Sequence, residues 1–310
     1  MPFVKEKYII EEETIAFLYV MRTLKYTQGQ AQRHIAKGRL LIDGKSMFLT
    51  GKKIKGTVEM VFFKPKSKGF KPTFQNRNFM IFEKPSGILV HPNTMSTPHS
   101  MLDEVRDIAG DNANATHRID METSGLLLAS KHKKAEIYLK GSFENRNIKK
   151  SYLAWVEGKL TKPFTSLESI QVNKEGYDKT KHKVFISSEG KSSRTDFIPL
   201  EYNETLDASL VACYPYTGRM HQIRVHLFHV KHPILGDPIY GASYLASNAY
   251  LEMTQSEEER LIHHGAPRLM LHAQSLSFSY GSHYYIESKE DFRSKKCLIY
   301  PKEKRLFNKN

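Results

Sequence analysis

The stretch that decides the fold is HRIDMETSGLLLAS, residues 117–130, where a His, an Arg and an Asp stand directly before a run of aliphatic residues. Three successive leucines lie between Gly125 and Ser130, a pattern typical of a strand buried on both faces of a sheet. A carboxylate at the mouth of such a strand costs free energy unless a cation or hydrogen-bond donor meets it. Asp120 is therefore either a paired structural charge or turn former, or a group kept for chemistry.

The residues on either side of this stretch predict one large α+β domain from residue 78 onward. Strands outnumber helices and do not alternate regularly with them, which argues against a doubly wound α/β fold. The expected strands are FMIFE (79–83), GLLLAS (125–130), SYLAWV (151–156), TDFIPLEY (195–202), ASLVACY (208–214), LHAQSLSFSY (271–280) and HYYIES (283–288). Helical patterns lie at 100–109 and 134–143 and after Thr217.

Charge indicates a polyanionic partner. The chain has 310 residues and a formal net charge of +14, and residues 21–71 hold thirteen Lys or Arg against two acids. Because most of the excess lies in one sixth of the chain, a dedicated nucleic-acid module is favoured over a diffusely basic surface.

Composition limits where the protein acts. A hydrophobic share of 40% indicates a globular core, and the longest wholly apolar stretch, 15–21, is far too short to span a membrane. The acidic run 11–13 has the wrong charge for a secretory leader, so we expect a cytoplasmic protein. Cys213 and Cys297 are expected to be reduced, buried thiols, and no two glycines have dinucleotide-loop spacing.

The basic segment predicts a compact module of two helices and a hairpin. A helix is expected over 14–26, a capping box over 27–30 begins a second helix, and Gly38 is placed to end it. Asp43-Gly44 is a strong two-residue hairpin signal, and a further strand is expected at 57–63. We therefore divide the chain into a module at 1–63, a basic Lys/Pro-rich linker at 64–77 that lies along the RNA path, and a large domain at 78–310.

This module resembles the S-four RNA-binding module, named after a ribosomal small-subunit protein. The shared features are a helical pair that carries Arg33, then Ile35, Gly38 and the Leu41–Gly44 turn. The resemblance implies RNA as the partner. We expect the RNA-contacting residues of the module to include Arg22, Arg33, Lys37 and Arg39.

The large domain resembles the RluA-type pseudouridine synthases. HRID-x-x-TSG is followed some ninety residues later by TGR-x-HQIR-x-H, which begins at Thr217. Three further stretches match that family's pattern in order: KPSGILVHP (84–92), KSYLAWVEG (150–158) and LHAQSLSF (271–278). The departures are Ile119 for the more usual Leu, and Met121-Glu122 where many members have Arg-Asp. The resemblance implies a large mixed, mainly antiparallel sheet and a reaction that needs no cofactor and no metal.

The resemblance also assigns roles. Asp120 falls on the family's catalytic aspartate, Tyr152 on its active-site tyrosine, and Arg224 on the arginine that pairs with the aspartate. Arg118 matches an arginine implicated in holding RNA where the target base is extruded, and Ile223 or Leu271 could pack near the base. The expected enzyme isomerises uridines of ribosomal or transfer RNA, ribosomal first, and acts as a monomer.

Two other functions compete with this one. A ribosome-assembly factor could keep the fold and bind RNA without catalysis, although an intact Asp, Tyr and Arg set favours the enzyme. A metal-dependent RNA hydrolase could use the histidines of 221–232. Arg224 and Lys231 would repel a cation there, and no acid lies between the histidines, so we expect packing or phosphate-facing roles for them. Lys84-Pro85 is expected to form a turn.

Overall fold

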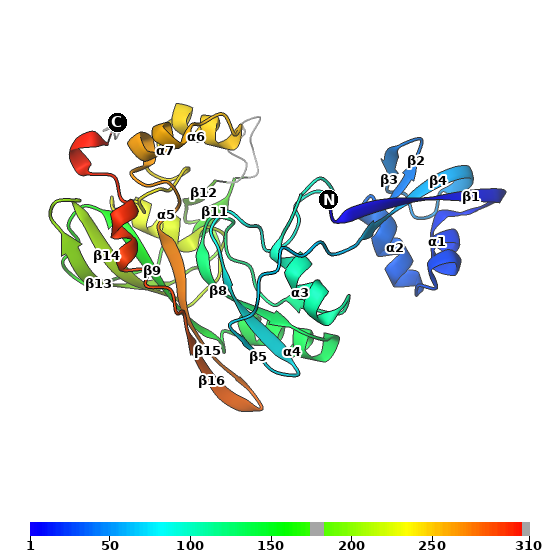
Figure 1. Ribbon diagram of the computed structural model, residues 1–310, viewed down its shortest axis with the longest axis horizontal. Coiled ribbons are helices and arrows are strands. Elements are labelled where there is room, and N and C mark those ends of the chain that lie inside the picture. Colours follow the sequence, from blue (N-terminus) through cyan, green and yellow to red (C-terminus); the bar gives the residue numbers. More distant parts are fainter. Residues whose placement is uncertain (174–182, 306–310) are drawn as a thin grey trace.

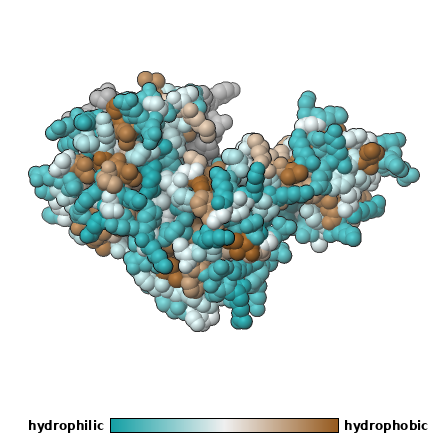
Figure 2. All heavy atoms as spheres, viewed as in Figure 1, coloured by the Kyte–Doolittle hydropathy of each residue, from teal (hydrophilic) through white to brown (hydrophobic). Residues whose placement is uncertain are grey.

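A computed structural model describes residues 1–173 and 183–305 and divides them between two lobes joined by residues 64–73 (Figure 1). The predicted linker, 64–77, includes Phe74–Gln75, which the structure places in the large-lobe sheet as β5. The N-terminal lobe is a four-stranded sheet of order β1-β4-β2-β3 with two helices against it. Its surface in the view of Figure 2 is mostly hydrophilic. Its elements are β1 (Phe3–Ile15), α1 (Ala16–Leu24), α2 (Gln28–Ala36), β2 (Leu40–Ile42), β3 (Lys45–Met47) and β4 (Lys53–Phe63).

The capping box and hairpin expected in this lobe are present. Thr27 and Gln30 form the box at the start of α2, and β2 pairs with β3 around Asp43-Gly44. The thirteen-residue strand β1 was not predicted, because six of its residues are Lys or Glu, which are poor strand formers and interrupt its apolar residues. Its pairing with β4 is what stabilises it.

The large lobe contains a ten-stranded mixed sheet, and this confirms the predicted α+β class. Its main path is β10-β13-β14-β9-β15-β8-β6-β5, with β16 beside β15 and β7 beside β8. Only the β15–β8 pair among these described strands is parallel. The strands are β5 (Phe74–Gln75), β6 (Phe79–Lys84), β7 (Asn114–Ala115), β8 (Ser124–Ser130), β9 (Lys149–Glu157), β10 (Phe164–Ser166), β13 (Thr195–Asn203), β14 (Ala208–Pro215), β15 (Leu271–Tyr280) and β16 (Ser282–Glu287).

Helices cover this sheet, and a small separate hairpin lies beside it. The two helices predicted at 100–109 and 134–143 are α3 and α4, and the one expected after Thr217 is α5. Two helices and five short strands were not predicted: α6, α7, β5, β7, β10, β11 and β12. The bounds are α3 (Met101–Ala109), α4 (Lys133–Glu144), β11 (Ile170–Val172), β12 (Val184–Ile186), α5 (Gln222–His229), α6 (Tyr244–Leu251), α7 (Glu257–His264) and the 3-10 turns η2 (Ser294–Leu298) and η3 (Lys302–Lys304).

Strand β8 is the centre of the large lobe, as the opening stretch predicts. All seven of its residues are buried, and it pairs with β6 on one side and with β15 on the other. Gly125 has φ +100°, and a Cβ there would come within 2.4 Å of the Ala273 carbonyl oxygen. Only glycine therefore allows β15 to approach this closely.

Two other expectations concern the cysteines and the membrane. Both cysteines are free thiols, and Cys213 is buried as expected, but Cys297 is exposed because it lies on the surface turn η2. Within 1–173 and 183–305, no helix combines the length and the apolar character that crossing a bilayer requires.

Candidate active site

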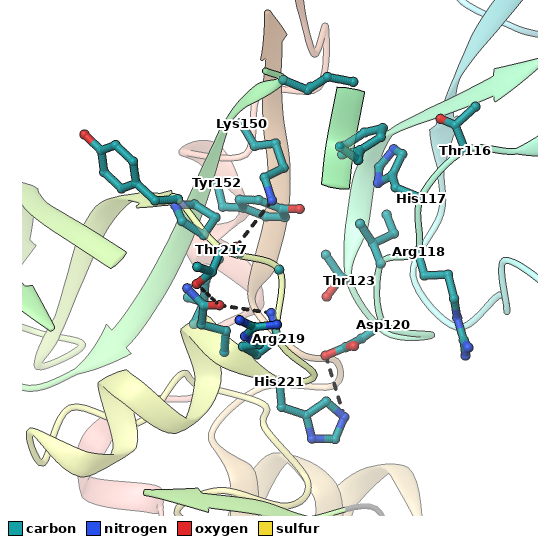
Figure 3. A pocket seen from close by; sticks show the side chains of 18 of the residues that line it. Thr116, His117, Arg118, Asp120, Thr123, Lys150, Tyr152, Thr217, Arg219 and His221 are labelled. Carbon is teal, nitrogen blue, oxygen red and sulfur yellow. Dashed lines mark hydrogen bonds and ion pairs between the residues drawn. The ribbon is translucent and has the colours of Figure 1, made fainter. Parts of the chain in front are cut away.

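A cavity of about 670 Å³ opens at the mouth of β8, a volume within the usual range for a small-ligand pocket. Its lining comes from the loop before β8, from β9, and from the segment that enters α5 (Figure 3). Asp120, Tyr152 and Arg224 all line it, as do Ile223 and Leu271. The structure therefore brings together residues more than one hundred positions apart in the chain.

The carboxylate of Asp120 is met by a guanidinium that a second carboxylate orients. Arg224 donates from Nη1 to Oδ2 of Asp120 at 2.9 Å. Its other donors, Nε and Nη2, bind both oxygens of Asp237 at 2.7 and 2.8 Å. Asp237 is fully buried and also accepts the backbone N–H groups of Ile239 and Tyr240. Because Asp237 binds Arg224 through two parallel hydrogen bonds, the guanidinium is held in one orientation, with Nη1 directed at Asp120.

Asp120 is held in its charged form. Burial would raise the pKa of Asp120, but His221, Arg224 and Lys84 together outweigh burial and lower it. The His221 Nε2 lies 3.9 Å from the same Oδ2 that Arg224 binds, and 30% of the Asp120 side chain remains open to solvent. An ionised, partly open carboxylate with its cations behind it is suited to attack an electrophilic carbon.

Lys84 holds the loop that carries Asp120 through hydrogen bonds to backbone carbonyl oxygens. This lysine ends β6, is buried, and donates to the carbonyl oxygens of Pro85, Ile88 and Met121 at 2.8, 2.9 and 2.8 Å. Burial lowers the pKa of Lys84 to about 7, against the opposing effect of Asp120. Lys84 was expected only to form a turn with Pro85; a turn does follow at residues 86–87, and Lys84 also fixes the backbone beside Asp120.

Glu122, one of the departures from the family pattern, forms contacts that hold neighbouring segments together. It is buried, and its carboxylate accepts from Tyr250 at 2.6 Å and from the backbone N–H of Leu269 at 3.0 Å. Arg260 forms an ion pair with it. Tyr250 and Arg260 come from the unpredicted helices α6 and α7, so these helices are anchored to the loop that carries Asp120.

Tyr152 lies on β9 and presents its ring to the cavity beside Lys150, which is two residues earlier on the same face (Figure 3). Burial and then the charge of Asp120 raise the pKa of Tyr152. The hydroxyl is therefore neutral at physiological pH and suits stacking and hydrogen bonding. Burial lowers the pKa of Lys150 to about 8, and its Nζ contacts the Thr217 carbonyl oxygen at 3.4 Å.

The opposite wall is a loop locked by Gln222. Its Oε1 accepts from the Thr217 hydroxyl at 2.6 Å and from the Arg219 N–H at 3.0 Å. Its Nε2 donates to the Arg194 carbonyl and the Thr195 hydroxyl. This network sets the entry into α5 and thereby the position of Arg224.

The predicted RNA-contacting residues lie outside the catalytic cluster. Arg118 is exposed at the cavity rim, and in Figure 3 its side chain points away from Tyr152 and Asp120. Arg22, Arg33, Lys37 and Arg39 belong to the N-terminal lobe; the first three are exposed and Arg39 is half-buried.

His117, the histidine of the opening stretch, is structural. His117 stacks on Phe143 with ring centroids 4.5 Å apart, and its Nε2 accepts the Leu128 N–H. Burial lowers the pKa of His117 to about 3, so the ring is neutral.

The histidines of 221–232 do not converge on a common point. His226 contacts Ser193 and Thr195 in the core, His232 contacts the Glu157 carbonyl, and His221 faces Asp120. In the described part of the chain, one trio of metal-type ligands comes close together, Glu83, His272 and Glu290, and it includes none of these histidines. These contacts are those of packing and orienting residues.

Sequence reasoning missed four residues of this site. Lys150 precedes Tyr152 at the spacing that puts both on one strand face, which was an available signal. His221 was assigned to the histidine cluster, Lys84 to a turn, and Asp237 was noted only as a nearby acid. Nothing in the sequence shows that Asp237 and Asp120 share one guanidinium.

Comparison with known proteins identifies the family of the chain. The RNA pseudouridylate synthase family profile matches residues 78–229. An uncharacterized RNA pseudouridine synthase of Helicobacter pylori strain J99 is 38% identical, over 93% of this chain and 96% of its own length. The dual-specificity RNA pseudouridine synthase RluA of Escherichia coli K12 is 34% identical, over 71% of this chain and 92% of its own length.

A solved structure, human RNA pseudouridylate synthase domain containing 1, shares the fold. It has a TM-score of 0.59 at 24% identity and covers 80% of this chain and 94% of its own. The chain thus belongs to the RNA pseudouridine synthases, and within them to the RluA-type family. It is an isomerase that acts on RNA, which favours the enzyme over the non-catalytic assembly factor.

Proposed function

We propose that this enzyme converts specific uridines of structured ribosomal RNA to pseudouridine, with Asp120 as the nucleophile. One observation carries the proposal: an ionised carboxylate lies in an open cavity, bonded to a buried arginine at 2.9 Å, with an aromatic ring on the adjacent wall. Ribosomal RNA is favoured because the N-terminal lobe resembles a module named after a ribosomal protein.

The proposed reaction conserves every atom of the nucleotide. A carboxylate oxygen of Asp120 attacks ribose carbon 1′, and the bond to uracil N1 breaks with its electron pair leaving on the base. The freed uracil turns within the cavity, and its carbon 5 then bonds to carbon 1′ and displaces the carboxylate. Carbon 5 loses its proton and N1 gains one, so the step needs no oxidant, reductant or external group.

The surrounding residues support each part of this sequence. Arg224 keeps Asp120 charged before attack and stabilises it again when it leaves. Tyr152 offers a flat face on which uracil stacks while it turns, and a neutral hydroxyl near the base edge. Extrusion of the base costs a few kcal/mol, and Arg118 at the rim would offset part of this cost by holding the phosphate backbone.

Asp120→Asn tests the proposal. Asn keeps the shape but lacks the nucleophilic oxygen pair, so tritium release from uracil carbon 5 of a labelled transcript should stop, while RNA affinity stays within a few fold. Turnover at a tenth of wild type or more would remove Asp120 from this role. Pseudouridine mapping of ribosomal and transfer RNA from cells with and without the protein identifies the target, and a change confined to transfer RNA would overturn the ribosomal assignment.

A further inference from the structure

The two lobes meet at an aromatic pair that is flanked by two arginines. Phe3 and Phe63 are cross-strand partners at the end of the β1–β4 ladder, with ring centroids 5.2 Å apart in an edge-to-face arrangement. The guanidinium of Arg39 lies 5.3 Å from the Phe3 ring centroid. That of Arg106, from α3 of the large lobe, lies 5.2 Å from the Phe63 centroid. Both lobes therefore contribute a cation to one place, which we call the joint cluster: Lys37, Arg39 and Arg106.

The linker holds the joint cluster in a fixed geometry. Glu104, two residues before Arg106 on α3, is buried and accepts from the Ser67 hydroxyl and from the backbone N–H groups of Lys68 and Phe70. Asp103, also buried, accepts the Lys66 N–H at 3.0 Å. The first part of the linker is thereby fastened to the start of α3. The separation of Arg39 and Arg106 is consequently a property of the folded chain.

The charges of the joint cluster oppose one another. In residues 1–173 and 183–305, no carboxylate forms an ion pair with Lys37, Arg39 or Arg106. Burial and then the charge of Arg106 lower the pKa of Arg39, and burial, Arg39 and Arg106 in turn lower that of Lys37. Arginine stays protonated in proteins, so Arg39 keeps its charge beside Arg106, whose own charge Asp111, Glu136 and Asp103 partly offset.

The positive field continues from the joint cluster to the cavity. His91 lines the cavity, and the charges of Arg118 and Arg106 both contribute, after burial, to lowering its pKa. On the other side, Lys37 feels the charge of Arg33, on α2. A path of cations therefore runs from α2 of the N-terminal lobe, through the joint cluster, to the rim where Asp120 is reached.

We propose that the joint cluster is a phosphate-binding site for the backbone of the substrate RNA, in which Arg39 and Arg106 clamp one phosphate between the lobes. The inference rests on the proposed function, because it takes RNA as the polyanion. Two guanidiniums provide planar donor pairs that suit phosphate oxygens, and the aromatic pair behind them keeps both oriented. A backbone contact at a fixed distance from the cavity would select RNAs whose target uridine lies at the matching distance from that phosphate.

The test is a salt series of RNA binding. A labelled stem–loop RNA with a uridine in its loop is titrated with wild type, Arg39→Gln, Arg106→Gln and the double variant. Each phosphate contact contributes about 0.7 to 0.9 to the slope of log affinity against log salt. We expect each single variant to lower the slope by about this amount, and the double variant to lower it little further, because both residues hold the same phosphate.

Matched controls separate charge from folding. Arg293→Gln with Lys302→Gln removes an equal number of positive charges, two, from the C-terminal segment. We expect the salt slope of this control variant to match that of wild type. Arg39→Lys with Arg106→Lys keeps both charges and should retain most of the slope. A double-Gln slope equal to that of the control would overturn the site, and strictly additive single effects would overturn the shared phosphate.

The readout also distinguishes this site from the proposed reaction. Pseudouridine formation by wild type is measured separately on the RNA identified by mapping. Failure of that assay with an intact, non-additive salt effect would refute the proposed reaction and leave the phosphate site standing. Normal turnover by wild type, with no change of salt slope in the arginine variants, would refute the phosphate site and leave the proposed reaction standing.

Discussion

Asp237→Asn should slow the chemical step without weakening RNA binding. The substitution keeps the size of the side chain and keeps one oxygen, which can still accept from Ile239, Tyr240 and Arg224 Nη2. The other oxygen, which accepts from Arg224 Nε at 2.7 Å, becomes an NH₂ group that opposes that donor. Arg224 then loses one charge-assisted bond and its fixed orientation toward Asp120.

The size of the effect follows from the burial of this pair. Only 5% of the Arg224 side chain and none of the Asp237 side chain is exposed, and breaking a buried pair of this kind costs about 3–5 kcal/mol of stability. A charge-assisted hydrogen bond contributes about 1.5–3 kcal/mol. If that amount is lost from the transition state, the rate falls about 10- to 150-fold.

Single-turnover assays at saturating RNA measure this rate, and equilibrium binding measures affinity. Asp196→Asn is the matched control, since Asp196 also pairs with an arginine, Arg194, but at 3.3 Å and with 49% of the arginine side chain exposed. We expect it to cost less than about 1 kcal/mol and to leave the rate within twofold. If folded Asp237→Asn keeps the wild-type rate, or if it loses affinity and rate together, the orienting role of Asp237 is refuted.

Two further results are expected. Tyr152→Phe should bind RNA nearly normally but release the carbon 5 proton slowly, whereas Tyr152→Leu should also lose stacking, worth about 1–3 kcal/mol per base; a fully active Phe variant would limit this residue to stacking. Because the folded pKa of Asp120 is lowered, its carboxylate should stay ionised as pH falls through about 3.9, the usual value. A carbon-13 titration of its carboxyl group by NMR should therefore give a midpoint below that value, and a midpoint above it would contradict the assigned cations.

The parts of the fold that the sequence predicts are those specified by local pattern. The three leucines after Gly125 predict a buried strand, and the capping box at Thr27 predicts where α2 begins, because both signals act over a few residues. Strand β1 escaped prediction because its Lys and Glu side chains lack strand propensity, and only its pairing with β4 compensates. The helices that carry Tyr250 and Arg260 also escaped, although local signals mark them: Ser243 caps α6, and α7 begins at a capping box of Ser256 and Glu259.

The residues of the candidate active site likewise depend on contacts between segments that are far apart in the sequence. Asp120, Tyr152 and Arg224 were predicted together only because a family resemblance links their motifs, and no local pattern places Arg224 beside Asp120. The role of Asp237 depends on a turn after α5 that returns its carboxylate to a guanidinium thirteen residues earlier. Three-dimensional geometry alone supplies that information.

The charges around Asp120 bear on its proposed role as the nucleophile, which requires a carboxylate that is ionised and still reactive. If Arg224 had no other partner, its full charge would bind Asp120 tightly and lower its nucleophilicity. Asp237 takes two of the guanidinium bonds and offsets much of that charge. Lys84, with a pKa of about 7, contributes a charge that is only partly present at neutral pH. The carboxylate is thus held ionised by cations that are themselves shared or weakened, and one of its faces stays open to the cavity.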